Sequence, residues 1–214
     1  MSIAKVYSRA VTGIHAQEVT IEVHLSNGLP SLSIVGMPET AVKESKDRVR
    51  SAILNSQFTF PQQRITINLA PADLPKEGGR FDLPIALGIL AASNQIPLRA
   101  IADKEFIGEL GLAGECRSVR GVLPTALAAS AAKRTLILPE INAGEAALIE
   151  QCESFGADNL LAVCAHLHGQ QRLNLASSPD LSDAADYPDL IDIRGQSHAR
   201  RALEIAAAGS HSIL

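Results

Sequence analysis

The stretch that decides the fold is residues 65–93, ITINLAPADLPKEGGRFDLPIALGILAAS. Apolar and polar residues alternate at its start, which is typical of a half-buried strand over 64–69. The proline- and glycine-rich segment 71–81 cannot form regular structure and predicts a loop. Segment 83–93 is apolar on nearly every side, with Asp82 placed to cap it, and predicts a helix inside the core. A polar loop is therefore expected between a sheet strand and a core helix.

Outward from this stretch, predicted strands and helices are interspersed along the chain. Before it, alternating residues predict a strand over 19–25, and a second strand resumes over 32–35 after turn residues. Helical spacing of apolar residues then predicts a helix beginning at Pro38 and ending near 55. After it, we expect strands over 105–110, 135–138 and 160–163, and helices over 124–132 and 144–152. A further helix is expected over 198–208, followed by the start of a strand over 211–214. The fold class is therefore α/β, of the α+β type.

Composition excludes several classes of protein. The chain has 214 residues, of which 46% are hydrophobic and 20% are charged, so it is not a disordered protein. No apolar run is long enough to span a membrane, and the N-terminus lacks the apolar core of an export signal. The three cysteines form no recognisable disulfide or zinc pattern. We expect a reduced, cytoplasmic protein without membrane contact.

The amino-acid composition of the chain changes near residue 173. Residues 173–189, LNLASSPDLSDAADYPD, hold four aspartates, two prolines, three serines and no basic residue, which is typical of a solvated linker. We therefore predict a domain over 1–172, a linker over 173–189 and the truncated start of a second domain over 190–214. The net charge is −1 before residue 173 and −3 after it, so neither part would coat nucleic acid by bulk charge.

Two groups of cations stand out as candidate anion contacts. In the loop, Lys76 and Arg80 flank Gly78-Gly79 just before a helix, where backbone N–H groups favour anions. The alternative is a tight turn whose glycines supply positive φ. The helix from Pro38 carries further cations interspersed with acids, for which an ordinary solvated face is the alternative. These cations are Lys43, Lys46, Arg48 and Arg50.

The other candidate motifs predict no nucleotide, metal or catalytic site. The chain contains no phosphate-binding loop of the Walker type, which argues against ATP hydrolysis by these residues alone. His166 and His168 form an HxH pair without a further ligand at suitable spacing, so we interpret them as surface histidines and expect no metal site. Ser45 and Lys46 are adjacent on one helix, point about 100° apart, and cannot act as a nucleophile and base.

Three long strings and the tail resemble one family. They are VHLSNGLPSLSIVGMPETAVKESKDRVRSAILNS over 23–56, the stretch 65–93, FIGELGLAGECRSVRGVLPTALAA over 106–129 and DLIDIRGQSHARRALEIAAAGSHSIL over 189–214. They resemble the ComM/YifB competence proteins, also called Mg-chelatase-like ATPases. The resemblance implies a Lon-protease-like domain of the ribosomal S5 domain 2 type over 1–172. It also implies that 190–214 begins an AAA+ module and stops just before its Walker loop.

The resemblance to Lon proteases prompts a test for peptidase chemistry. Matching the loop Pro75–Asp82 to the Lon serine loop puts Arg80 in the place of the nucleophilic serine. Matching Arg120–Thr125 puts Thr125 in the place of the catalytic lysine. An arginine cannot attack an acyl group, and a threonine hydroxyl is not a general base near neutral pH. We therefore expect no catalytic residues; a hydrolase using some other dyad is the alternative.

The resemblance implies a function for the longer protein. Full-length relatives are hexameric, ATP-driven DNA helicases that promote branch migration in natural transformation, so ATP and Mg²⁺ are expected cofactors there and none in this chain. We expect the present chain to be the non-catalytic N-terminal domain, aiding ring assembly or DNA contact. Its expected DNA contacts are Lys76 and Arg80, then Lys43, Lys46 and Arg50. Gly195 and Gln196 are expected near the nucleotide. The alternative is a purely structural subunit-packing domain without DNA contact.

Overall fold

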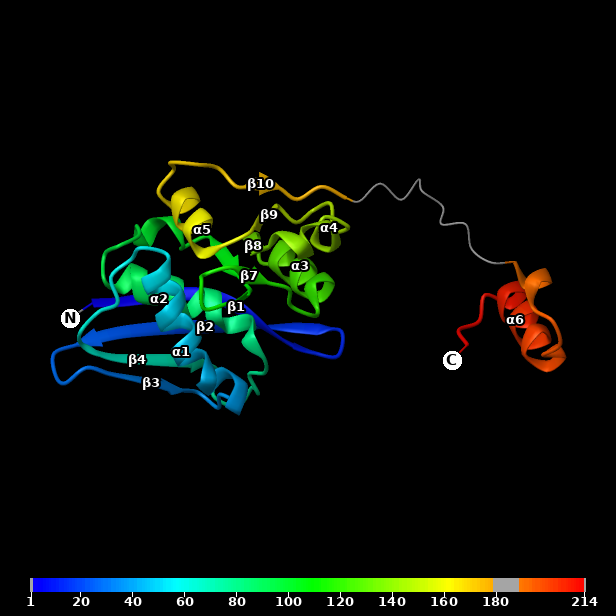
Figure 1. Cartoon of the computed structure of the whole chain (residues 1–214), viewed down its shortest axis with the longest axis horizontal. Coiled ribbons are helices and arrows are strands. Elements are labelled where there is room, and N and C mark those ends of the chain that lie inside the picture. The colour runs from blue at the N-terminus through cyan, green and yellow to red at the C-terminus, as the bar shows by residue number, and fades with distance from the viewer. Residues whose placement is uncertain (1, 179–188, 214) are drawn as a thin grey trace. The chain divides into compact units, whose positions relative to one another are not determined.

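The computed structural model describes residues 2–178 and 189–213 and divides the chain into two compact units, Met1–Pro179 and Asp180–Leu214. Each unit is described by itself. The first unit contains a sheet with helices against it, and the second is built around one helix (Figure 1).

The first unit is organised around an eight-stranded mixed sheet in the order β10-β9-β8-β5-β1-β2-β4-β3. β1 and β2 form a long antiparallel hairpin, β4 continues it antiparallel, and β3, β5, β8 and β9 add parallel pairs. The α/β prediction is therefore confirmed. The strand bounds are β1 Ser2–Thr12, β2 His15–Ser26, β3 Ser31–Val35, β4 Arg64–Ala70, β5 Lys104–Phe106, β8 Thr135–Pro139, β9 Ser154–Ala157 and β10 Asn174–Leu175. A separate two-stranded sheet pairs β6 (Glu109–Leu110) with β7 (Cys116–Arg117).

Helices cover both faces of the sheet. α2 (Asp82–Ala92) is wholly buried against β1 and β2, as its uniformly apolar sequence predicts, and α1 (Thr40–Asn55) packs on α2. A side chain in place of Gly88 would collide with Val23, so this glycine allows α2 to approach the sheet closely. Along β8, Ile137 joins the large core cluster on this face, while Leu136 and Leu138 pack with α3 (Val122–Ala131) in a second cluster. The alternation of β8 therefore serves two cores on opposite faces of the sheet.

A buried ion pair connects the sheet to α3. Arg9 on β1 donates from Nε and Nη2 to the two carboxylate oxygens of Glu105 on β5, at 2.7 and 2.6 Å. Arg9 also donates to the carbonyl oxygens of Ala16 and Ala128. Glu105 has no exposed side-chain area and receives a second cation, Arg134, at 3.2 Å. The charge of Arg9 is therefore matched by a carboxylate within the fold.

Several predicted elements were wrong. Segment 160–163 is not a strand but the start of helix α5 (Leu160–Leu167), and the strand is β9, just before it. The Asn159 side chain accepts from the backbone N–H of Ala162, and this N-cap starts the helix where periodicity over four apolar residues cannot distinguish helix from strand. The helix expected over 144–152 is only the single turn α4, Ala143–Ala146. Segment 105–110 forms two short strands in different sheets, and the long N-terminal strand β1 was missed.

The boundary of the first unit also differs from the prediction. β10 lies within the expected linker 173–189 and pairs antiparallel with β9, so the sheet extends beyond residue 172. The remaining helical turns of the first unit are short: η1 Gly79–Phe81, η2 Leu98–Ala100 and η3 Glu140–Asn142. No helix in the described ranges 2–178 and 189–213 is both long and apolar enough to cross a bilayer.

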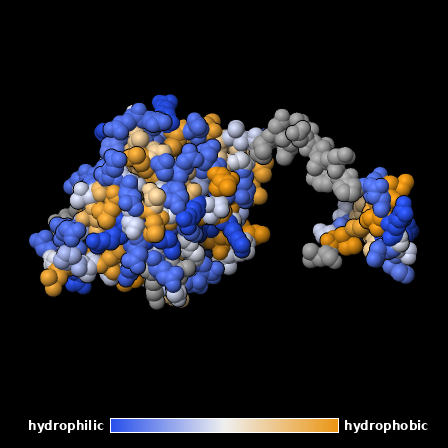
Figure 2. All heavy atoms as spheres, viewed as in Figure 1, coloured by the Kyte–Doolittle hydropathy of each residue, from blue (hydrophilic) through white to orange (hydrophobic). Residues whose placement is uncertain are grey.

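The second unit consists of a 3-10 turn, η4 (Leu190–Asp192), and helix α6 (Ser197–Gly209). Asp189 and Asp192 form a capping box at the start of η4. The helix matches the prediction, but residues 211–213 form no strand; strand pairing needs a neighbour, which these residues lack in the described part of the chain. Ala206 is the buried residue of α6, whereas Leu203 and Ile205 stay exposed, and apolar side chains are visible on this unit (Figure 2).

Candidate functional site

The loop between β4 and α2 lines a cavity of about 760 Å³ in the first unit. One wall is the end of β1, from Ala10 to Thr12, with Gln17 of β2 beside it. The loop supplies Gly78, Gly79 and Arg80, and the segment before α3 also lines the cavity. The full lining is Ala10, Val11, Thr12, Gln17, Leu74, Pro75, Glu77, Gly78, Gly79, Arg80, Glu109, Ser118, Val119, Arg120 and Gly121. The cavity is therefore lined by Arg80, one of the two Lon-like reactive positions of the sequence analysis, whereas Thr125 is not among its lining residues.

The glycines of the loop have steric roles. Gly78 has φ +70° and ψ −175°, a conformation that side chains other than glycine rarely adopt. A side chain in place of Gly79 would collide with the carboxylate of Glu109. These residues lead directly into the 3-10 turn η1 and then into α2. The interpretation as a turn whose glycines supply positive φ therefore holds for Gly78, whereas Gly79 is not among the positive-φ glycines and meets only the flexible Glu109 side chain.

Arg80 and Thr125 come together in the structure. The Nη2 atom of Arg80 donates to Oγ1 of Thr125 at 2.9 Å, and Nη1 donates to the carbonyl oxygen of Arg120 at 3.3 Å. The Thr125 hydroxyl in turn donates to the carbonyl oxygen of Gly121 at 2.8 Å. Two residues 45 positions apart, predicted from the resemblance to occupy matching reactive positions, are therefore in direct contact.

The electrostatic setting of Arg80 is unusual. Only 9% of the residue is exposed, and its Nε atom is buried without a hydrogen-bond partner. Burial lowers the pKa of Arg80 to about 10. Among the described residues no carboxylate forms an ion pair with it, so its charge rests on neutral oxygen acceptors. A buried guanidinium without an anion is energetically costly, because desolvation is not offset by an opposite charge.

The prediction that Lys76 is a surface contact is wrong. Lys76 is fully buried, and its ammonium group donates to the carbonyl oxygen of Pro71 within the same loop. Burial lowers its pKa. The backbone of Lys76 also accepts from the N–H of Glu39, which joins the loop to the start of α1. In this position the side chain stabilises the loop and cannot reach a phosphate in solvent. Arg80, also nine-tenths buried, is not a surface contact either.

Asp82 does not cap α2 through its side chain, contrary to the prediction. Its carboxylate instead accepts from Arg48 Nε at 2.7 Å and Nη2 at 3.1 Å, and from the N–H of Leu110. Burial raises the pKa of Asp82 to about 6, although Arg48 opposes that shift. The pair joins α1 to α2 beside the loop, so Arg48 is a structural residue.

The cations expected on α1 do not line the cavity. Arg50 is exposed, with its guanidinium carbon 5.0 Å from the centroid of the Phe60 ring, and Lys46 is half-buried. Lys43 belongs to the same helix, but its side chain lies outside the described parts of the structure. In the second unit, Gly195 has φ +75° and Gln196 has φ +50°, and both immediately precede α6. They form the turn into that helix.

Other candidate groups have structural explanations. His166 accepts from the N–H of Leu173, and His168 contacts the carbonyl oxygen of Cys164. Within residues 2–178 and 189–213, no group of three or more potential ligands could hold a metal. All three cysteines are free, and burial raises the pKa of Cys116 and of Cys164 to about 12, so neither is a ready thiolate.

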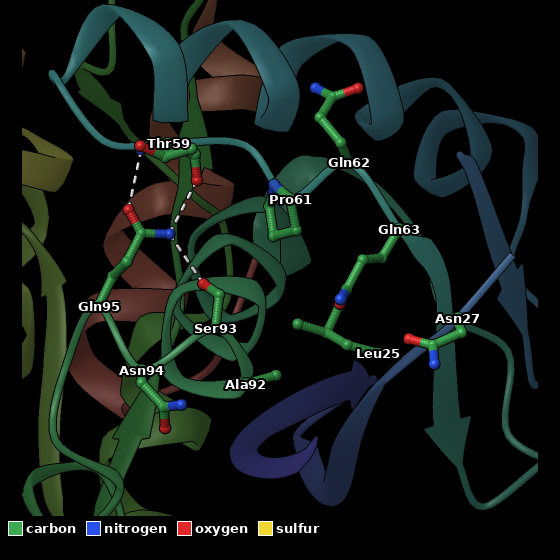
Figure 3. Close-up of a pocket in the computed structure, with 10 residues that line it drawn as sticks. All are labelled: Leu25, Asn27, Thr59, Pro61, Gln62, Gln63, Ala92, Ser93, Asn94 and Gln95. Atoms are coloured by element: carbon green, nitrogen blue, oxygen red, sulfur yellow. Dashed lines mark hydrogen bonds between the residues drawn. The ribbon is translucent and has the colours of Figure 1, made fainter. Parts of the chain in front are cut away.

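A second pocket, of about 640 Å³, lies beside the turn that follows β2 (Figure 3). Its polar groups are largely amides, and Gln95 forms hydrogen bonds to the backbone of Thr59 and to Ser93 at 2.8 Å each. These bonds hold the pocket wall together and leave the Gln95 amide occupied (Figure 3). Its lining is Leu25, Asn27, Thr59, Pro61, Gln62, Gln63, Ala92, Ser93, Asn94 and Gln95, none of which is charged. The Arg80 cavity is therefore the stronger candidate site.

Comparison with known proteins assigns the family. Residues 21–142 match the family described as subunit ChlI of Mg-chelatase, and residues 189–214 match the family described as magnesium chelatase, subunit ChlI. The chain therefore belongs to the Mg-chelatase ChlI-type family, within the ComM/YifB group. It is similar to Competence protein ComM of Haemophilus influenzae, with 54% identity over the whole chain and 43% of that protein.

Two further relatives show the breadth of the group. Uncharacterized protein YifB of Salmonella typhimurium is 50% identical over the whole chain and 42% of its own length. Uncharacterized protein Mb2921c of Mycobacterium bovis is 37% identical, again over the whole chain and 43% of its own length. The chain thus spans less than half the length of the curated relatives it matches.

Sequence reasoning missed three features of the site. Glu109 and the backbone of Arg120 lie at the cavity because β6 and the segment before α3 fold beside the loop, which residue spacing does not reveal. The burial of Lys76 was also missed, since a Lys-Glu-Gly-Gly-Arg loop usually predicts exposure. The Arg9–Glu105 pair joins residues 96 positions apart, and no local pattern signals it.

Proposed function

We propose that this chain is the non-catalytic N-terminal part of a hexameric AAA+ DNA helicase that promotes branch migration during natural transformation. In the longer protein, ATP and Mg²⁺ would act in the AAA+ module that begins in the second unit, near Gly195 and Gln196. The similarity to Competence protein ComM over the whole chain supports the link to competence. We further propose that the protein works in the cytoplasm and that the first unit aids ring assembly.

One observation carries the non-catalytic assignment. Arg80 and Thr125, in the positions expected to be reactive, are hydrogen-bonded to each other at 2.9 Å. Neither side chain can act as an acyl nucleophile, and the Thr125 hydroxyl already donates to the Gly121 carbonyl oxygen. Cys116 and Cys164 do not substitute for them, because their raised pKa values keep both thiols protonated at neutral pH.

The longer protein should therefore hydrolyse ATP in response to DNA without cleaving peptides. The test incubates it with an unfolded protein substrate and a serine-directed probe, and in parallel with ATP and a four-way DNA junction. We expect no cleavage, no labelling, and ATP-dependent migration of the junction. Digestion of the substrate, or a junction that ATP does not move, would contradict the proposal.

A second candidate role is direct DNA contact by α1. The exposure of Arg50 and the partial exposure of Lys46 favour it over contact by the loop, where Lys76 and Arg80 are buried. Each would contact phosphate without reading sequence. Several copies in a ring would strengthen a contact that is weak in one copy.

Charge reversal separates this role from a packing role without DNA contact. Lys46→Glu with Arg50→Glu should weaken single-stranded DNA binding by the full-length hexamer and reduce its salt dependence. Arg99→Glu with Lys133→Glu is the matched control, because both residues are exposed and the net charge changes equally. Equal DNA affinity of the two double variants would favour the purely structural packing domain.

A further inference from the structure

The Arg80 guanidinium differs from the other buried or half-buried guanidinium groups of the first unit. Arg9 is matched by Glu105, and Arg48 by Asp82, each through two hydrogen bonds to one carboxylate. Arg80, nine-tenths buried, has only the Arg120 carbonyl and the Thr125 hydroxyl as acceptors, and its Nε has none. Lys76 is also buried and donates only to the Pro71 carbonyl oxygen, but it does not line the cavity. Within the described residues, Arg80 is therefore the buried cation without a carboxylate partner that lines the cavity.

The position of this cation allows a ligand to supply the anion. Arg80 lines a cavity of about 760 Å³, which has room for a group of several heavy atoms. Thr125 holds the guanidinium from the side of α3, so its place is fixed before a ligand arrives. An ordered guanidinium binds planar oxyanions well, because two N–H groups can face two oxygens.

The end of β1 provides a second set of hydrogen-bonding groups. β5 pairs with β1 only at Tyr7↔Glu105, so in the described structure the segment from Ala10 to Thr12 is paired with β2 alone. This segment lines the same cavity. In an antiparallel pair every second residue directs its N–H and C=O away from the partner strand. A ligand containing amide groups could use these positions.

The charges around the cavity favour a ligand with one negative charge. Four ionisable residues line it: Arg80 and Arg120 are cations, and Glu77 and Glu109 are anions. Glu109 lies against Gly79 and also contributes to the field at Arg48. A polyanion such as a nucleic-acid backbone would place further negative charges near both glutamates, at a cost that a single carboxylate avoids.

We propose that this cavity binds a carboxylate at Arg80, carried by a short, otherwise uncharged body with amide groups that lies along the end of β1. The chemical class is that of a polypeptide chain terminus. This site is separate from the α1 cations and does not depend on the proposed helicase function. The bound carboxylate would form the ion pair with Arg80 that no described residue provides.

The test titrates the full chain with N-acetyl-Ala-Ala-Ala, with its C-terminal amide, and with inorganic phosphate. We expect the acid to bind with a dissociation constant of about 1 mM, typical of so small a ligand. The amide should bind at least about tenfold more weakly, because it cannot form charge-assisted hydrogen bonds. Phosphate should also bind more weakly than the acid. Equal binding of acid and amide, or tighter binding of phosphate, would overturn the assignment.

Variants locate the site within the chain. Arg80→Lys keeps the charge but loses the planar pair of donors, and should weaken binding of the acid by about tenfold. Glu77→Gln removes an exposed negative charge and should strengthen binding by about twofold at low salt, a gain that misfolding cannot imitate. Arg99→Gln, an exposed cation outside the cavity, is the control and should leave affinity unchanged. Unaltered affinity in both Arg80→Lys and Glu77→Gln would refute the proposal.

Discussion

Arg9 and Arg80 are buried to a similar degree, but different groups surround their guanidinium groups. Arg9 is 7% exposed and Arg80 is 9% exposed. Around Arg9, the sheet and α3 supply the Glu105 carboxylate and two carbonyl oxygens. Around Arg80, the loop and α3 supply only neutral oxygens. In the first region the cation has a carboxylate partner, whereas in the second no carboxylate of the described residues pairs with Arg80.

The largest loss of stability is expected when Arg9 is replaced. Arg9→Met should lower the free energy of unfolding by about 3 to 4 kcal/mol, because Glu105 would stay fully buried with Arg134 as its remaining cation. Urea unfolding followed by circular dichroism measures the change. A loss below about 1 kcal/mol would mean that the pair contributes no more than a surface ion pair.

The Arg48–Asp82 ion pair extends the comparison of Arg9 with Arg80, because its contribution to stability depends on pH. The pKa of Asp82 in the folded protein is about 6, raised above its ordinary value of 3.8, so the folded state binds the proton more tightly than the unfolded state. The free energy of unfolding should therefore fall as pH rises from about 4 to about 6, by about 2 to 3 kcal/mol.

Asp82→Asn isolates this effect, since asparagine does not titrate. Chemical denaturation at several pH values should give a smaller decline in stability between pH 4 and 6 for the variant than for the wild type. Identical pH profiles would show that Asp82 keeps the same pKa in the folded and unfolded states. Asp158→Asn, at an exposed carboxylate outside this pair, serves as the comparison variant.

Substitutions of Thr125 test how much its hydroxyl, the neutral hydrogen-bond acceptor of Arg80, contributes to stability. Thr125→Val removes the acceptor for Arg80 Nη2 and the donor to the Gly121 carbonyl oxygen, and should cost about 1 to 2 kcal/mol of stability. Thr125→Ser keeps the hydroxyl and should recover most of this loss. Thermal unfolding of both variants measures the difference, and equal stability would show that the hydroxyl bonds contribute little.

The smallest effect is expected at Arg80 itself. Arg80→Met removes two hydrogen bonds but also removes a buried, uncompensated charge, so the net change should be within about 1 kcal/mol of zero. The same substitution would therefore be costly at Arg9 and nearly neutral at Arg80. Denaturant unfolding of the two variants side by side tests this; equal losses would mean that surroundings do not distinguish the two arginines.

Much of the local structure followed from residue patterns. Alternation predicted β2 and β4, because burial on one face leaves a period of two in the sequence. The turn after β2 and a short apolar segment predicted β3 and β8, and uniform apolarity predicted the buried helix α2. Short apolar segments such as 160–163 were not decidable in this way. There, the Asn159 cap determined a helix.

Some features of the candidate site could likewise be predicted from the sequence, and others only from the tertiary structure. The resemblance in sequence predicted that Arg80 and Thr125 stand where Lon proteases have a nucleophile and a base, and neither residue type supplies that chemistry. Only the tertiary structure decided that Lys76 is buried, that Arg80 meets Thr125, and that Glu105 reaches Arg9 and not Arg80. Charge pairing depends on which distant strands become neighbours, and sheet order is set by packing of the whole core, which no local pattern encodes.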